Sequence, residues 1–257
     1  IAGDGSVKLV LEDQDEPCST NMNGNWNIPV SNAANASTSG NFGYTKDSNT
    51  YQFFMNYLNG DSYSMASAFK NFQTTKLSSY LSDLKEGEWC LADKAYASES
   101  ADVTTATPLT EAAKAAASYY YYDSYVRLMG GSTKQPTLKC NGTKMDKFAD
   151  KTTMYVGALT ADEIVYAGAD TNYTENYTYY LVNDYQRGKS LSWWSLSPYS
   201  FGGDVDYAFD VNYMGELSDY IPVNSDRYAL RPSVSLKSST LINAGGEGTL
   251  AKPYVIG

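Results

Sequence analysis

The sequence predicts a single α+β domain over residues 1–257, because both periodicities of regular structure occur in one undivided chain. Apolar and aromatic residues alternate with polar ones over residues 205–213, the period-two pattern of a strand with two unlike faces. Residues 64–85 instead repeat apolar side chains at helical spacing, with Ser64 as a candidate N-cap and Gly87 as a candidate stop. No fixed-period repeat and no linker-like run divides the chain.

The first two thirds of the chain carry shorter elements. Residues 6–12 alternate like a half-buried strand, and residues 18–50, rich in Asn, Ser, Gly and Thr, predict a long ordered loop. Residues 109–118 are Ala-rich and follow a Pro, which favours a short helix. Aromatic and β-branched side chains predict strands, and these are residues 119–129, 154–159 and 178–182.

Three further signals mark where helices, turns and strands begin in the last part of the chain. Thr160 and Glu163 form a Thr-x-x-Glu capping box, which predicts the start of a helix. Gly215 lies in a turn, so that Leu217 begins a return strand. Residues 230–236 alternate again, with Pro232 marking a bulge or a strand entry.

The alternation over residues 205–213 predicts how this strand is oriented. One face carries apolar and aromatic groups for the core. The other face carries acids and amides, and we expect it to meet solvent or ligand; its residues are Asp206, Ala208, Asp210 and Asn212.

Composition excludes several classes of function. The formal net charge of −10 disfavours nucleic acid and anionic membranes as partners. No apolar run of about 18 residues is present, so we expect no membrane insertion by this fragment. The chain has no His, which removes His-based triads and His metal sites.

The three Cys residues, Cys18, Cys90 and Cys140, show no metal-binding or redox spacing. If one disulfide forms, we favour Cys90 with Cys140. Three buried free thiols are the alternative.

The segment from about residue 195 to 230 has the composition of a recognition surface. It is dense in Tyr, Asp, Asn, Ser and Gly, and it lies between a Trp pair and an Arg-Pro pair. Tyr supplies contact area at low entropic cost, while the small polar residues supply adaptable hydrogen bonds. The segment, here called the insert, shows no catalytic machinery.

The frame around the insert resembles a known family. WWSLSP, YALRPSVSL and GGEGTLAKPYVI, with EWCLADKAY and LTADEIVYAG upstream, resemble the C-type-lectin-like domain, of the formylglycine-generating-enzyme type, in surface proteins of Gram-positive gut bacteria. They are also similar to the variable proteins of diversity-generating retroelements. The resemblance implies a small twisted antiparallel sheet, two main helices, long ordered loops, and residues 7–11 paired near residues 234–236.

The resemblance also implies roles for individual residues. Trp193 and Trp194 would pack the core, and the Arg231 guanidinium would satisfy loop carbonyls. The outward, ligand-binding positions would be Tyr199, Phe201, Asp204, Asp206, Tyr207, Asn212, Tyr213, Asp219, Tyr220, Asn224, Asp226 and Tyr228. For Tyr207 and Tyr213 the alternation over residues 205–213 indicates the opposite, since it places both with Phe209 on the inner face.

We therefore expect an extracellular or cell-surface, non-enzymatic adhesin or receptor-type domain that uses no cofactor and no obligatory metal. Its partner would be a protein or glycan on another cell or on a phage surface. An acidic face favours a cationic, neutral or polyhydroxylated ligand. Adenine-directed mutagenesis of Asn codons would produce the composition of the insert, and so would any loop-rich surface.

Three alternatives remain open. A pilin-like filament subunit would show a large apolar assembly patch. A calcium-dependent lectin could draw oxygens from Asp204, Asp206, Asp210, Asn212 and Glu216, although no EF-hand loop is present. A glycan-acting enzyme would need two carboxyls, drawn from Asp204, Asp206 and Asp210, on either side of a scissile bond. Formylglycine-type oxidation would need a Cys pair that the C-terminal region lacks.

Overall fold

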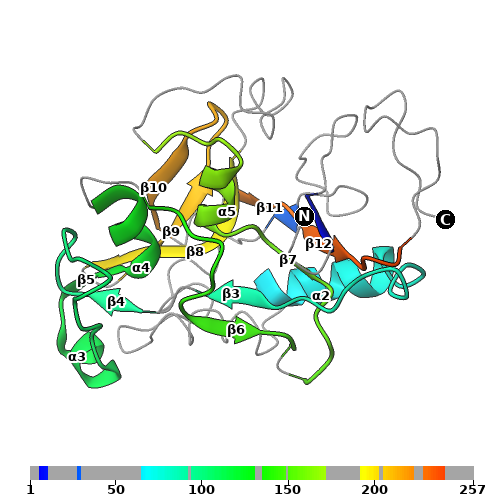
Figure 1. Cartoon of the computed structure of the whole chain (residues 1–257), viewed down its shortest axis with the longest axis horizontal. Helices are drawn as coiled ribbons and strands as arrows, with labels where there is room; N and C mark the ends of the chain where they lie inside the picture. The colour runs from blue at the N-terminus through cyan, green and yellow to red at the C-terminus, as the bar shows by residue number, and fades with distance from the viewer. Residues whose placement is uncertain are drawn as a thin grey trace.

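The computed structural model describes residues 6–10, 28–29, 65–91, 94–130, 135–148, 150–171, 192–202, 205–222 and 228–240. The loop expected at 18–50 and the strand expected at 178–182 fall outside these residues, apart from a two-residue strand at Ile28–Pro29. Mixed helices and mostly antiparallel strands make up the described part, as the α+β prediction requires (Figure 1). None of the described helices has the length and hydropathy that crossing a bilayer requires.

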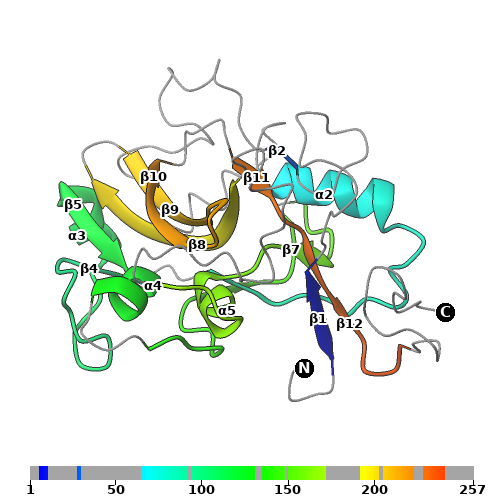
Figure 2. The same cartoon turned by 90° about the horizontal axis from the view of Figure 1, so that it is seen from above.

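The largest sheet has seven strands arranged around one long central strand, β8 (Figure 2). One edge of β8 pairs antiparallel with β9, which continues to β10. The other edge pairs parallel with β11 near its start and antiparallel with β5 near its end. The strands are β2 (Ile28–Pro29), β4 (Ala95–Tyr96), β5 (Tyr119–Tyr122), β8 (Ser192–Gly202), β9 (Val205–Val211), β10 (Leu217–Pro222) and β11 (Tyr228–Leu230).

The β9–β10 hairpin confirms the predicted strand, turn and return strand. Gly215 has a positive φ of 82°, a conformation that glycine adopts without steric cost. The side-chain oxygen of Asn212 accepts hydrogen bonds from the backbone N–H groups of Met214 and Glu216, at 2.9 and 3.2 Å. This local bonding closes the turn and places Leu217 opposite Val211.

Both faces of β8 are covered by hydrophobic clusters, and all of its residues but the last are buried. The first cluster includes Trp89, Tyr120 and Trp194 and lies on one side. The second cluster, on the other side, includes Trp193 and Phe209. The insert therefore starts from a strand that is buried on both faces.

This double coverage overturns one expectation. The polar face of β9 was expected to meet solvent or ligand, but Ala208 and Asp210 are 4% and 0% exposed. Ala208 belongs to the first cluster, so the face that alternation marks as polar packs inward as well. Period two separates the two faces of a strand but does not show whether a second layer covers the more polar one.

A second sheet joins segments from near the start and the end of the described chain. It contains β1 (Val7–Val10), β12 (Ser233–Leu236) and β7 (Val156–Gly157), with β12 in the centre. β1 runs antiparallel to β12, with Val7 opposite Leu236. This pairing confirms the expected contact between residues 7–11 and 234–236.

The helix predicted over residues 64–85 is shorter than expected. α2 (Met65–Lys76) ends where the chain enters a series of turns. Gln73 is buried and bonds across to another segment, donating to the Thr153 carbonyl and accepting from the Tyr155 N–H. Phe69 packs in the first cluster, as the apolar stripe predicted.

Two short helices begin at predicted positions. α3 (Glu111–Ala116) is capped by Thr110, whose hydroxyl accepts from the Ala113 N–H at 3.2 Å. α5 (Ala161–Tyr166) has both hydrogen bonds of the capping box between Thr160 and Glu163. Only Val156–Gly157, β7, forms a strand within the segment predicted at 154–159.

The strand predicted over residues 119–129 is correct only for its first part. After β5 the chain turns into α4 (Asp123–Tyr125) and a π-helical turn, Val126–Gly130. Helical geometry brings Arg127 within 2.8 Å of Asp123, four residues before it. Alternation in a short aromatic run did not reveal this ion pair, which a strand could not make.

A two-stranded unit lies below β8 in Figure 1. It pairs β3 (Trp89–Leu91) with β6 (Thr143–Met145) in antiparallel register. A disulfide joins Cys90 to Cys140, which are 50 residues apart in sequence. This is the pair that the sequence analysis favoured.

Candidate functional site

The residues predicted to hold the insert are buried at its base. Trp193, Trp194 and Arg231 are 1%, 2% and 1% exposed. Trp193 lies opposite Ala229 in the parallel pairing of β8 with β11, so the two ends of the insert are adjacent. The guanidinium carbon of Arg231 lies 5.3 Å from the centroid of a Trp193 ring, a cation–π arrangement.

Two residues predicted to face a ligand are core residues instead. Tyr199 and Phe201 are 6% and 0% exposed. Phe201 stacks on Tyr120 at 5.1 Å between ring centroids, and Tyr199 lies 4.3 Å from Tyr125. The outward assignment of Tyr199 and Phe201 is wrong, because the end of β8 is covered on both faces.

Burial also affects the chemistry of these rings. Desolvation is the main cause that raises the pKa of Tyr199 well above its ordinary value. It raises the pKa of Tyr125 to about 12. Neither phenol is therefore an activated acid or nucleophile, and both act as packing groups with a hydroxyl.

The remaining predicted contact residues divide into those the structure describes and those it does not. Tyr207 and Tyr213 are half-buried. They therefore match neither the fully outward position that the resemblance implies nor the core position that the alternation predicts. Asn212 is also half-buried, and its amide donates to Glu216 while its oxygen holds the turn. Asp204, Asn224 and Asp226 lie outside the described residues, as do the side chains of Asp206, Asp219, Tyr220 and Tyr228.

Asp210 is fully buried in the sheet. Neither carboxyl oxygen has a hydrogen bond of normal geometry. Burial raises the pKa of Asp210 to about 8, and the hydroxyl of Ser218, which lies opposite on β10, opposes that rise only in part. Asp210 is thus protonated at neutral pH and unsuited to be a calcium ligand or a solvent-facing catalytic carboxylate.

Alternation in the four-Tyr run predicts that some of its rings are exposed, but sequence reasoning did not place this aromatic surface next to the insert. Tyr119 and Tyr121 occupy one face of β5, where Tyr119 is 39% exposed and Tyr121 is half-buried. Tyr120 and Tyr122 point the other way and are fully buried. A strand with four consecutive Tyr residues must direct them alternately to its two faces. The sequence did not predict that β5 pairs with the end of β8, however, because the two strands are far apart in the chain.

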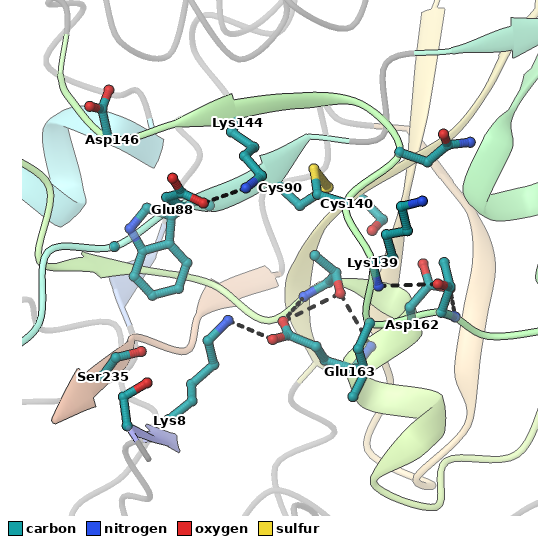
Figure 3. A pocket seen from close by; sticks show the side chains of 18 of the residues that line it. Lys8, Glu88, Cys90, Lys139, Cys140, Lys144, Asp146, Asp162, Glu163 and Ser235 are labelled. Carbon is teal, nitrogen blue, oxygen red and sulfur yellow. Dashed lines mark hydrogen bonds and ion pairs between the residues drawn. A yellow bond between two sulfur atoms is a disulfide. The ribbon is translucent and has the colours of Figure 1, made fainter. Parts of the chain in front are cut away.

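The described residues also enclose a cleft of about 870 Å³ between the β3–β6 unit and the start of α5 (Figure 3). The Cys90–Cys140 disulfide lies on one side of it, and Lys8 and Glu163 lie on the other. Its walls are polar and carry both signs of charge. That composition fits a polar ligand better than an apolar one.

Most charges in this cleft are already paired with each other. Lys8 contacts Glu163 at 2.5 Å, and Lys144 contacts Glu88 at 2.5 Å. A hydrogen bond and the charge of Lys144 hold the pKa of Glu88 below its usual range. Each pair lies on its own side of the cleft, and pairing leaves no activated nucleophile or base among these four residues.

A buried ion-pair network forms one wall of the cleft. Arg127 donates to Asp123 at 2.8 Å and contacts both carboxylate oxygens of Asp162. The Thr137 N–H donates to Asp162 at 2.8 Å. Burial alone would lower the pKa of Arg127, but its two carboxylate partners outweigh this and raise it. The network joins the helical turn after β5 to α5, a structural role.

Among the residues that the structure describes, no group of three or more Cys, Asp and Glu side chains is placed to hold a metal ion. Comparison of the chain with protein-family models, with curated proteins and with solved structures finds no match.

Proposed function

We propose that this protein is an extracellular ligand-binding domain of adhesin or receptor type, with a C-type-lectin-like fold. The insert between the Trp pair and Arg231 displays the contact residues. The domain acts by recognition and not by catalysis, and its partner is a protein or glycan on the surface of another cell or of a phage.

The observation that carries this proposal is that buried residues hold the two ends of the insert together. Trp193 on β8 and Ala229 on β11 are neighbours in a parallel pairing, and Arg231 lies over the Trp193 ring. A segment whose two ends are held together by buried groups can vary its outer side chains without unfolding the core. This is the arrangement that a recognition surface requires.

Other features support the assignment to this fold and compartment. The antiparallel pairing of β1 with β12 brings together segments from near both ends of the described chain, as the resemblance implies. The Cys90–Cys140 disulfide is typical of proteins that mature in an oxidising environment, such as the cell exterior.

The absence of catalysis is supported by the residues themselves. The chain contains no His. Asp210, one of the three neighbouring acids that a glycosidase could use with Asp204 and Asp206, is buried, and its raised pKa of about 8 keeps it protonated at neutral pH. A solvent-accessible carboxylate pair is what glycoside hydrolysis needs.

The test is binding of the whole chain to an array of glycans and surface proteins. An insert variant, Tyr213→Ala/Tyr220→Ala/Tyr228→Ala, should lose about tenfold or more in affinity for any ligand found, since aromatic anchors dominate such interfaces. A distal control, Tyr80→Ala, removes a tyrosine that is 51% exposed in the turns after α2. Equal binding by the insert variant and the wild type would refute the proposal.

A further inference from the structure

The tyrosines of β5 share a face of the sheet with a residue of the insert. In the register of the sheet, Tyr121 lies opposite Ser200 on β8, and Ser200 lies opposite Tyr207 on β9. Residues in register on adjacent strands project from the same face. Tyr119, two residues before Tyr121, shares this face. Tyr119, Tyr121 and Tyr207 are called the tyrosine surface below.

The tyrosine surface is held in place by close packing. A side chain at Gly202 would place its Cβ 2.1 Å from the ring of Tyr119, so that ring lies directly against the glycine backbone. The Tyr119 hydroxyl lies 3.3 Å from the hydroxyl of Ser200. Gly202 is required here because any other residue would displace the ring.

A series of contacting aromatic rings connects this surface to the core. Tyr119 and Tyr121 have centroids 4.9 Å apart, and Tyr121 stacks on Tyr125 at 5.0 Å. The series continues through Tyr199 to Phe209. Rings fixed in this way lose little conformational entropy when a partner binds, which is how rigid aromatic anchors gain affinity.

The charge beside the tyrosine surface is negative. Glu99 is exposed, and its carboxylate accepts a hydrogen bond at 3.2 Å from Tyr125, the ring stacked on Tyr121. The chain as a whole carries a formal charge of −10. Tyrosine faces attract cations through the ring quadrupole, and an adjacent carboxylate adds to that attraction.

We propose that the tyrosine surface, together with Glu99, docks an arginine- or lysine-bearing peptide segment of a protein partner. The cationic side chain would lie on the faces of Tyr119 and Tyr121, with its charge toward Glu99. The inference rests on the proposed binding function and gives the partner its chemistry. It also extends the contact area from the insert to β5, at the end of the large sheet away from α2 (Figures 1 and 2).

The experiment is calorimetric titration of the whole chain with the peptide Ac-GRGRGRG-NH2 at low salt. Tyr119→Ala should weaken binding by about fivefold to tenfold, because a cation–π contact contributes roughly 1 kcal/mol. Tyr119→Phe keeps the ring and should bind like the wild type. The distal control Tyr80→Ala has the same net charge as Tyr119→Ala and should also bind like the wild type.

Glu99→Gln tests the carboxylate beside the tyrosine surface. It should weaken binding of the Arg peptide by severalfold while leaving the melting temperature within about one degree. A peptide in which Glu replaces Arg should not bind. No binding of the Arg peptide to the wild type, or equal losses in Tyr119→Ala and in the distal control, would overturn the proposal.

The two proposals fail separately. If the insert variant keeps its array ligand while Tyr119→Ala loses the peptide, the insert assignment fails and the tyrosine surface stands. If the array ligand depends on the insert but the peptide binds regardless of Tyr119, only the inference about β5 fails.

Discussion

At the scale of single residues, Asp210 has the most unusual environment among the described carboxyls. It occupies a position on β9 that alternation marks as outward, yet it is fully buried and lacks a normal hydrogen bond. An unfolded Asp has a pKa of about 3.9, whereas burial raises the pKa of Asp210 to about 8. Between these two pH values the folded chain holds a proton that the unfolded chain releases.

The stability of the protein should therefore depend on pH through Asp210. The free energy of unfolding should fall as pH rises from about 4 to 8, by at most about 1.4 kcal/mol per pH unit from this group. Asp210→Asn is neutral at every pH and should lose that slope. Urea denaturation at several pH values between 5 and 8 measures it.

Asp102→Asn is the matched control for this experiment. Hydrogen bonds from Thr104 lower the pKa of Asp102, so its titration lies below the tested range. That variant should keep the slope of the wild type. The same slope in Asp210→Asn as in the wild type would show that Asp210 is ionised in the folded protein.

At the scale of elements, local signals were reliable where the residues that form the structure are close in sequence. The capping box at Thr160 and Glu163 and the β9–β10 turn around Gly215 formed as predicted. The strand predicted over residues 119–129 ends after Tyr122, and in the helical turns that follow Arg127 pairs with both Asp123 and Asp162. Asp162 lies 35 residues away in sequence, beyond any local pattern.

The disulfide between β3 and β6 provides a test at this scale. Closing a loop of 50 residues should stabilise the fold by about 2–4 kcal/mol through the entropy of the unfolded chain. Cys90→Ser/Cys140→Ser should therefore lower the free energy of unfolding by about that amount. Chemical denaturation of both proteins, with and without a reducing agent, measures the difference.

Cys18→Ser is the control, because it removes a thiol and leaves the disulfide intact. It should keep the wild-type sensitivity to the reducing agent. If the double Ser variant is as stable as the oxidised wild type, the bridge contributes nothing to folding.

At the scale of the whole molecule, the packing of other segments against each face of the large sheet determines which of its side chains are exposed. The sequence indicated the strands around the insert and the buried Trp pair, but not the layer that covers the second face of β8. Tyr199 and Phe201 were misplaced for that reason, since each packs on aromatic rings from the segment around β5. Such contacts join segments far apart in sequence. The exposed part of the aromatic cluster is consequently Tyr119, on a strand that the insert does not contain.

The separation between a buried frame and a displayed face is the central claim, and it concerns the molecule as a whole. Trp193 belongs to the frame, with 1% of its surface exposed. Its replacement by Ala should cost about 3–5 kcal/mol, as for other core aromatic residues. The insert variant should cost clearly less, on the order of 1 kcal/mol in total, because its side chains are expected to contact a partner and not the core.

The most direct measurement compares the free energies of unfolding of Trp193→Ala and the insert variant, Tyr213→Ala/Tyr220→Ala/Tyr228→Ala, by urea denaturation under identical conditions. The account predicts a large loss for Trp193→Ala and a small loss for the insert variant. Comparable losses in the two proteins, or a larger loss in the insert variant, would contradict it, because the tyrosines of the insert would then hold the core together.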